Sequence, residues 1–126
     1  MVEQVEQSRV AWVDTDAGGR IHFTAAFRWA ELAETALMRR LGLIGATWGD
    51  YPRRKVEAEY LKVLRFEDEI EIRLRVEKVG RTSVTYSWTI TKDGDAHVKG
   101  RHTVVHVDGE GHPDPLADRV RAALDR

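Results

Sequence analysis

TAAFRWAELAETALMRRL, residues 24–41, is the stretch that decides the fold of this chain. Its apolar residues recur at intervals of three or four, which places them on one face of an α-helix. They are Ala26, Phe27, Ala30, Ala33, Leu37, Met38 and Leu41, with Trp29, Leu32 and Ala36 widening the apolar arc. Gly42 supplies a stop signal. The pattern predicts one long helix, about Thr24 to Leu41, that other parts of the chain largely cover.

Segments typical of β-strands flank this helix. Ser8–Val13 fits a short first strand, and a connector containing Gly45, Gly49 and Pro52 follows the helix. Alternating apolar and polar residues predict four further strands: Arg54–Leu61, Ile70–Glu77, Thr82–Thr91 and Ala96–Val107, with Asp93-Gly94 as the last hairpin turn. Asp114-Pro115 opens a short helix with an apolar side of Leu116, Val120, Ala123 and Leu124. The predicted fold class is α+β, with about five mainly antiparallel strands curling around the long helix.

Composition restricts the classes of protein that fit. The 126 residues suit one domain, residues 1–126, and the absence of Cys excludes a thiol nucleophile and a disulfide framework. Met1–Gln7 has no apolar core and no stretch is long enough to span a membrane, so a cytoplasmic protein is expected. The 20 basic and 21 acidic residues are mixed along the chain, which argues against a nucleic-acid partner.

The loop before the long helix carries the residues with chemical potential. It contains two carboxylates, Asp14 and Asp16, and two consecutive glycines, Gly18 and Gly19. In a structural interpretation the aspartates accept hydrogen bonds from nearby backbone N–H groups and the glycines permit positive φ. In a functional one, free N–H groups at the helix start stabilise a developing oxyanion, and a neighbouring carboxylate completes an acyl-transfer site. The residues alone leave both interpretations open.

Val13–Phe23, taken with the helix that follows, resembles the hot-dog fold acyl-CoA thioesterases of the 4-hydroxybenzoyl-CoA thioesterase type. The family pattern is Asp-x-Asp-x-x-Gly, a short apolar pair, and a helix with an acidic residue about twelve positions after the second glycine. The matching residues are Asp14, Asp16, Gly19, Ile21 and Glu31, with Trp29 and Leu41-Gly42-Leu43 beyond them. The likeness continues through Val56–Tyr60 and Arg65–Glu69 and spans roughly Arg9 to Asp108.

The resemblance implies a mechanism and an assembly. Asp16 would attack the thioester carbonyl of an acyl-CoA or acyl-carrier-protein substrate, or activate water for that attack, and the backbone N–H of Phe23 would polarise the carbonyl. No metal or cofactor is implied, and the active site would lie at a subunit interface of a homodimer or homotetramer. Many relatives have Tyr-His-x-Asn-Tyr where this chain has residues 22–26, His-Phe-Thr-Ala-Ala, so a more apolar pocket is expected beside Asp16.

Other polar residues are weaker candidates. Gly19, His22, Glu31 and Arg81 are predicted to contact substrate, and the basic run Arg53–Lys55 is a further candidate for the phosphates of coenzyme A. His22 would act as an acid or base unless its ring points away from the site. Glu34 lies within the apolar arc of the helix, so its carboxylate would line a cavity or interface or pair with an arginine. The candidate partners of Glu34 are Arg28 and an arginine of another chain.

The remaining histidines predict no metal site. His102 and His106 share a face of the last strand but lie roughly 13 Å apart, and His97 and His112 are expected to be solvated. Two alternative functions stay open. A hydratase or dehydratase would need a facing histidine and carboxylate, for which His22 with Glu31 or Glu34 is the candidate pair. A non-catalytic acyl-CoA-binding module would bind without releasing thiol.

Overall fold

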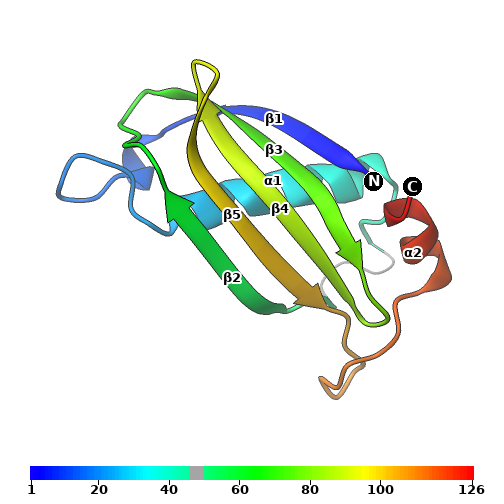
Figure 1. The fold of residues 1–126 in the computed structure, drawn as a ribbon. Coiled ribbons are helices and arrows are strands. Elements are labelled where there is room, and N and C mark those ends of the chain that lie inside the picture. Colours follow the sequence, from blue (N-terminus) through cyan, green and yellow to red (C-terminus); the bar gives the residue numbers. More distant parts are fainter. Residues whose placement is uncertain (46–49) are drawn as a thin grey trace.

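The computed structural model describes residues 1–45 and 50–126 (Figure 1). Its elements are β1 (Glu3–Arg9), a 3₁₀ turn (Trp12–Asp14), α1 (Ala25–Arg40), β2 (Arg53–Tyr60), β3 (Glu69–Val79), β4 (Ser83–Lys92), β5 (Asp95–Val105) and α2 (Asp118–Leu124). The predicted order of strands and helices is confirmed. Gly49 of the predicted connector lies outside the described residues.

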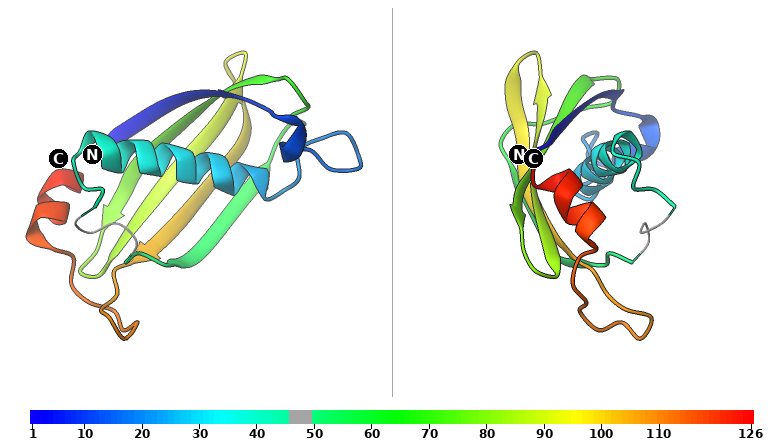
Figure 2. Two further views of the ribbon diagram at one scale, coloured as in Figure 1. Left: turned by 180° about the vertical axis from the view of Figure 1, so that it is seen from behind. Right: turned by 90° about the vertical axis from the view of Figure 1, so that its right-hand side faces the viewer.

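The five strands form one antiparallel sheet in the order β1-β3-β4-β5-β2. The sheet curves around α1, which lies across its concave face, while α2 covers one end (Figure 2). The predicted α+β arrangement of a sheet around a long helix is therefore confirmed. Neither helix among the described residues is long and apolar enough to cross a membrane.

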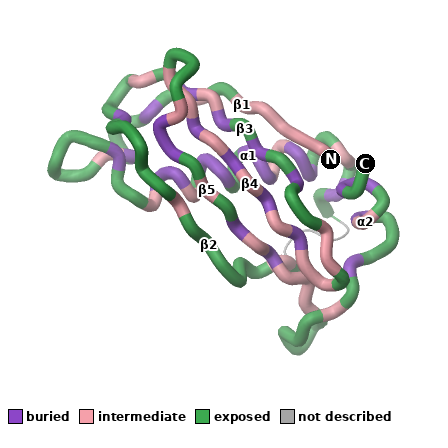
Figure 3. Tube along the Cα trace, in the orientation of Figure 1, coloured by how far each residue is buried: buried purple, intermediate pink, exposed green. Residues whose placement is uncertain are grey.

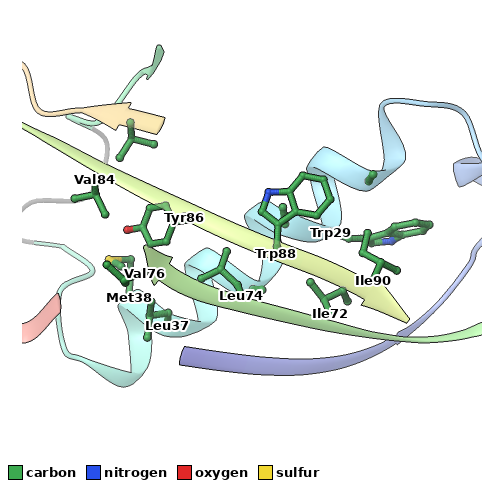
Figure 4. Close-up of a cluster of buried hydrophobic side chains, with 14 of the residues drawn as sticks. Trp29, Leu37, Met38, Ile72, Leu74, Val76, Val84, Tyr86, Trp88 and Ile90 are labelled. Atoms are coloured by element: carbon green, nitrogen blue, oxygen red, sulfur yellow. The ribbon is translucent and has the colours of Figure 1, made fainter. Parts of the chain in front are cut away.

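Much of the core lies between α1 and the neighbouring strands β3 and β4. Alternate residues of β3 and β4 are buried against the helix, among them Ile72, Leu74, Tyr86, Trp88 and Ile90 (Figure 4). Residues between them along the strands face outward, and β2 at the sheet edge is mostly exposed (Figure 3). The sequence alternation of β3 and β4 thus reports a sheet with one buried face.

The long helix begins and ends close to its predicted bounds. Thr24 occupies the cap position, and the carbonyl of Leu37 accepts the N–H of Leu41 at the C-terminal end. Gly42 follows with a φ of 71°, as its predicted role as a stop requires. Leu32 is 43% exposed, so one flank of the helix is left uncovered by this chain.

Two predicted boundaries are wrong. The first strand covers Glu3–Arg9 rather than Ser8–Val13. Among the described strands it pairs with β3 alone, as an edge strand, and its mostly polar residues show no strong apolar alternation. The apolar run that follows forms the 3₁₀ turn instead. The last helix begins at Asp118, because the carbonyls of His106 and Arg81 accept the N–H groups of Asp114 and Leu116 and hold that segment outside the helix.

Candidate active site

The loop between the 3₁₀ turn and α1 folds back on itself. Thr15 and Ile21 form an isolated β-bridge, and the Asp16 N–H donates to the Arg20 carbonyl at 2.8 Å. The turn between them is closed by the Gly19 N–H, which donates to the Asp16 carbonyl at 3.1 Å. Gly19 has a φ of 78°, a conformation that glycine adopts without strain. These contacts fix the backbone of Asp16 immediately before the helix.

The two loop carboxylates have different environments. Asp14 is buried, and its Oδ2 accepts the Ala11 N–H at 2.8 Å while its Oδ1 pairs with Arg28 at 2.9 Å. Asp16 is exposed, and its Oδ1 accepts the Gly18 N–H at 2.8 Å. Within residues 1–45 and 50–126, no donor contacts Asp16 Oδ2. Asp14 therefore has the structural role, and Asp16 keeps an oxygen available for chemistry.

Asp16 opens onto a groove of about 370 Å³. One wall comes from the loop and the helix start, the other from the segment that follows β2. The lining residues are Asp16, Arg20, Ile21, Phe23, Tyr60, Leu61, Lys62, Val63 and Leu64. A mostly apolar groove with two cations and one carboxylate suits an apolar ligand that carries negative charge away from the reacting carbon.

Phe23, which lines this groove, has an unpaired backbone N–H. The first carbonyls of the helix region are occupied, since His22 accepts the Ala25 N–H at 2.9 Å and Thr24 accepts the Phe27 N–H at 3.1 Å. The Phe23 N–H has no acceptor anywhere in the described part of the chain. It lies at the positive end of the 16-residue helix α1, where a donor favours developing negative charge. The structure thus brings the predicted pair Asp16 and Phe23 to one groove.

Gly19 and His22 lie beside the groove but do not line it. The Gly19 carbonyl accepts the Arg65 side chain at 3.4 Å. The His22 ring is exposed, lies 2.7 Å from the Thr24 hydroxyl through Nδ1, and stacks on the Phe23 ring. This contact occupies one nitrogen of His22 with the helix start.

Glu31 and Arg81 are not brought to the groove in this chain. Glu31 is exposed, and its carboxylate lies 3.6 Å from the Arg53 guanidinium. Arg81 lies in the turn between β3 and β4, at the end of the sheet opposite the loop (Figure 1). Its carbonyl accepts the Leu116 N–H and the Arg121 side chain, which ties the turn to the C-terminal segment.

Glu34 belongs to a buried polar network that joins α1 to the sheet. Its Oε1 lies 2.7 Å from Arg53 and 2.8 Å from His102 Nε2, and its Oε2 accepts Arg53 at 3.0 Å. The Trp88 indole N–H donates to His102 Nδ1 at 3.2 Å. Because an indole N–H only donates, His102 carries its proton on Nε2 and donates it to Glu34. The arginine partner is Arg53 of the same chain, not the Arg28 considered from sequence.

The network controls the ionisation of Glu34. Burial by itself raises the pKa of this carboxyl, but the hydrogen bonds from His102 and Arg53 and the positive charge of Arg53 outweigh it and lower the pKa. Glu34 is therefore held as a carboxylate. The space beside it measures about 10 Å³, too small for an acyl substrate. The histidine that faces Glu34 is His102, not the His22 of the predicted hydratase pair.

The prediction for His97 is wrong. It was expected to be solvated, but it is buried, and its Nδ1 lies 2.8 Å from the Asp95 carbonyl. Its own carbonyl accepts the N–H groups of Leu61 and Lys62, which bring the segment after β2 over it. No group of three or more His, Asp or Glu side chains within the described residues is placed to hold a metal ion.

Sequence reasoning missed the second wall of the groove. Arg20 lies in the loop that was singled out, and Tyr60 ends the matched segment Val56–Tyr60. The four residues after it, Leu61–Leu64, fall between Val56–Tyr60 and Arg65–Glu69, the two segments that resemble the family. These four residues could have been found from their position, because this short, mostly apolar run separates two segments that both resemble the family.

A curved antiparallel sheet wrapped around one long helix defines the chain as a hot-dog domain. The family model described as the Thioesterase-like superfamily matches residues 10–124, and the chain belongs to this superfamily. The chain is therefore a thioesterase by family, which confirms the predicted class of enzyme.

Individual proteins agree with this assignment. A curated Aquifex aeolicus (strain VF5) protein named as a candidate esterase is 29% identical over 107 residues, covering 80% of this chain and 84% of that protein. A crystal structure of a hypothetical protein from Aquifex aeolicus has a TM-score of 0.89 at 26% identity, covering 95% and 98% of the two chains. A 1,4-dihydroxy-2-naphthoyl-CoA thioesterase from Synechocystis also has a TM-score of 0.89, covering 98% and 96%; at 14% identity it shows the shared fold.

Proposed function

We propose that this protein hydrolyses an acyl-CoA thioester, with Asp16 as nucleophile or general base and the Phe23 N–H as oxyanion donor. One observation carries the proposal: the two groups line one groove, and each has a free atom with which to act. Acyl-carrier-protein thioesters have the same reacting group and are the alternative substrate.

The proposed reaction converts a thioester and water into a carboxylic acid and a thiol. As a nucleophile, Asp16 forms a C–O bond to the carbonyl carbon, the C–S bond breaks, and water hydrolyses the resulting anhydride. As a base, Asp16 takes the proton of the attacking water, and the departing thiolate receives it. On both routes the Phe23 N–H stabilises the negative carbonyl oxygen of the tetrahedral intermediate.

The lining of the groove supports an acyl-CoA as substrate. Ile21, Leu61 and Val63 offer apolar contact to the acyl group or the pantetheine arm, while Arg20 and Lys62 offer positive charge to phosphates. The Synechocystis relative acts on an aromatic acyl-CoA, so aromatic acyl-CoAs, including 4-hydroxybenzoyl-CoA, are the first substrates to test. Arg81 would contact such a substrate only from a second copy of the chain.

We also propose that the working enzyme is a homodimer or homotetramer. Phe23 is 62% exposed at the groove, and Val56 is 49% exposed on β2. In the described chain β2 pairs only with β5, so its other edge is open. A second copy would cover these apolar side chains and close the groove, which light scattering of the purified protein tests directly.

The decisive experiment is Asp16→Asn, a nearly isosteric change that removes the charge. We expect kcat for a thioester cleaved by the wild type to fall by at least about 100-fold. The free energy of unfolding should change by less than about 0.5 kcal/mol, because Asp16 is exposed. Asp125→Asn, an exposed aspartate after α2, is the matched control and should keep wild-type turnover. Unchanged turnover in Asp16→Asn would remove Asp16 from the mechanism.

Thiol release from a panel of aromatic, short-chain, long-chain and β-keto acyl-CoAs identifies the substrate. Saturable binding of every substrate with no thiol release would support the acyl-CoA-binding module instead. Addition of water to an enoyl-CoA would support the hydratase alternative.

A further inference from the structure

We infer that Tyr60 is a positioning residue: it holds the carbonyl of Phe23 and so restrains the residue whose N–H is the proposed oxyanion donor. The inference rests on the proposed function and adds to it a residue from a distant part of the chain. Tyr60 is the last residue of β2, and its hydroxyl donates a hydrogen bond to the Phe23 carbonyl. Both residues line the groove that contains Asp16.

The Phe23 carbonyl has no donor from the helix. The regular bonds of α1 begin one residue later, where Thr24 accepts the N–H groups of Phe27 and Arg28 at 3.1 and 3.4 Å. In the described structure, the group that donates a hydrogen bond to the Phe23 carbonyl is the Tyr60 hydroxyl. The hydrogen bond to this carbonyl therefore comes from β2 and not from α1.

The two peptides on either side of Phe23 are fixed separately. The preceding one is held by its carbonyl, since His22 accepts the Ala25 N–H at 2.9 Å. The N–H and C=O of one peptide point in opposite directions, so this bond turns the Phe23 N–H away from the helix. The following peptide is held by Tyr60 through the Phe23 carbonyl, and the Thr24 N–H donates to His22 Nδ1 at 3.3 Å. Without Tyr60, only the local contact with His22 restrains this second peptide.

The ionisation of Tyr60 suits this task. Burial raises the pKa of its hydroxyl above the ordinary value of 10.0, so the group stays protonated and remains a donor at neutral pH. The bond also joins the two walls of the groove, because Leu61–Leu64 follow Tyr60 directly and Ile21 precedes Phe23 by two residues. Tyr60 thus fixes the carbonyl side of Phe23, the residue that carries the proposed oxyanion donor, and joins it to the second wall of the groove.

Tyr60→Phe removes the hydroxyl and keeps the ring. We expect kcat to fall by about 10-fold to 100-fold, because a misdirected donor loses part of its stabilisation of the oxyanion. KM should stay within about twofold, since the lining of the groove is retained, and this split separates positioning from substrate binding. Tyr86→Phe is the matched control. It removes a hydroxyl from the buried face of β4, away from the groove, and should keep wild-type kcat whatever its effect on stability.

A second measurement does not depend on activity. In the ¹⁵N–¹H spectrum the Thr24 amide, which belongs to the same peptide as the Phe23 carbonyl, should shift in Tyr60→Phe but not in Tyr86→Phe, because the hydrogen bond to that carbonyl is lost only in the former. Wild-type kcat in Tyr60→Phe, or an unmoved Thr24 amide, would overturn the inference while the proposed function stands. If the wild type cleaves no thioester, the proposed function fails, and the amide signal still decides whether Tyr60 holds the peptide.

Discussion

Gly100 on β5 faces a buried tryptophan ring of the core with no room for a side chain. It pairs directly with Trp88 across the β4–β5 ladder, so both residues face the same side of the sheet. A Cβ at Gly100 would lie 2.1, 2.3 and 2.6 Å from ring atoms Cζ2, Cη2 and Cε2 of Trp88. We predict that Gly100→Ala destabilises the protein by forcing this ring to move.

The size of the effect follows from what surrounds Trp88. Carbon atoms in ordinary contact lie about 3.5 Å apart, so the ring must shift by more than about 1 Å. Trp88 is 2% exposed, packs edge-on against Phe27, and donates its indole N–H to His102. Overpacking of such a site costs about 1–3 kcal/mol. At the size of this domain, a loss of about 2 kcal/mol lowers the Tm by about 7 °C.

The assay is urea and thermal unfolding followed by far-UV circular dichroism, which does not depend on the environment of Trp88. Gly109→Ala is the matched control, because its Cβ would meet nothing within 4 Å and its backbone φ suits any residue. Gly109→Ala should change stability by less than about 0.5 kcal/mol. Adding Trp88→Phe should restore part of the stability that Gly100→Ala loses. A Gly100→Ala protein within about 0.5 kcal/mol of the wild type would refute the steric reasoning.

Two further predictions concern charged groups. Glu34 has a lowered pKa in the folded state because hydrogen bonds and charge outweigh burial, so its stabilisation is present above its ordinary value of 4.5 and is lost as the pH falls through the folded pKa. Glu34→Gln should cost about 1–3 kcal/mol at pH 7 and show a weaker loss of stability on acidification; parallel urea curves for both proteins across that range would contradict this. Arg20→Gln should raise KM for an acyl-CoA about fivefold at unchanged kcat, with a smaller effect at high salt. Equal KM values at low salt would show that Arg20 does not contact the phosphates.

Most of the fold could be predicted from sequence because its signals are local. The spacing of apolar residues located α1 to within a residue or two, and the alternation in β3 and β4 reported which side of the sheet is buried. β1 was misplaced because an edge strand of mostly polar residues carries no such signal. The first strand was predicted at Ser8–Val13 because residues 10–13 are apolar, although Trp12 and Val13 are 74% and 82% exposed.

The candidate site likewise contains residues that a local pattern locates and residues that it does not. Asp16 and Phe23 lie seven residues apart in one continuous loop, so the motif that locates Asp16 also locates Phe23. Tyr60 lies 37 residues from Phe23, and its contact arises only when the edge strand is folded beside the helix start. His102 and Glu34 are 68 residues apart and meet for the same reason. Sequence patterns report which face a residue takes, but not which distant residue it meets there.

The edge strand β2 explains why the buried network matters for the groove. Its first residue, Arg53, pairs with Glu34 inside α1, and its last residue, Tyr60, donates to Phe23 just before α1 begins. β2 is thus attached to the helix at both ends, although in the sheet it pairs only with β5. Both oxygens of Glu34 are occupied by donors, which leaves it unsuited to act as a base. Its carboxylate instead anchors the strand whose other end forms a wall of the groove beside Asp16.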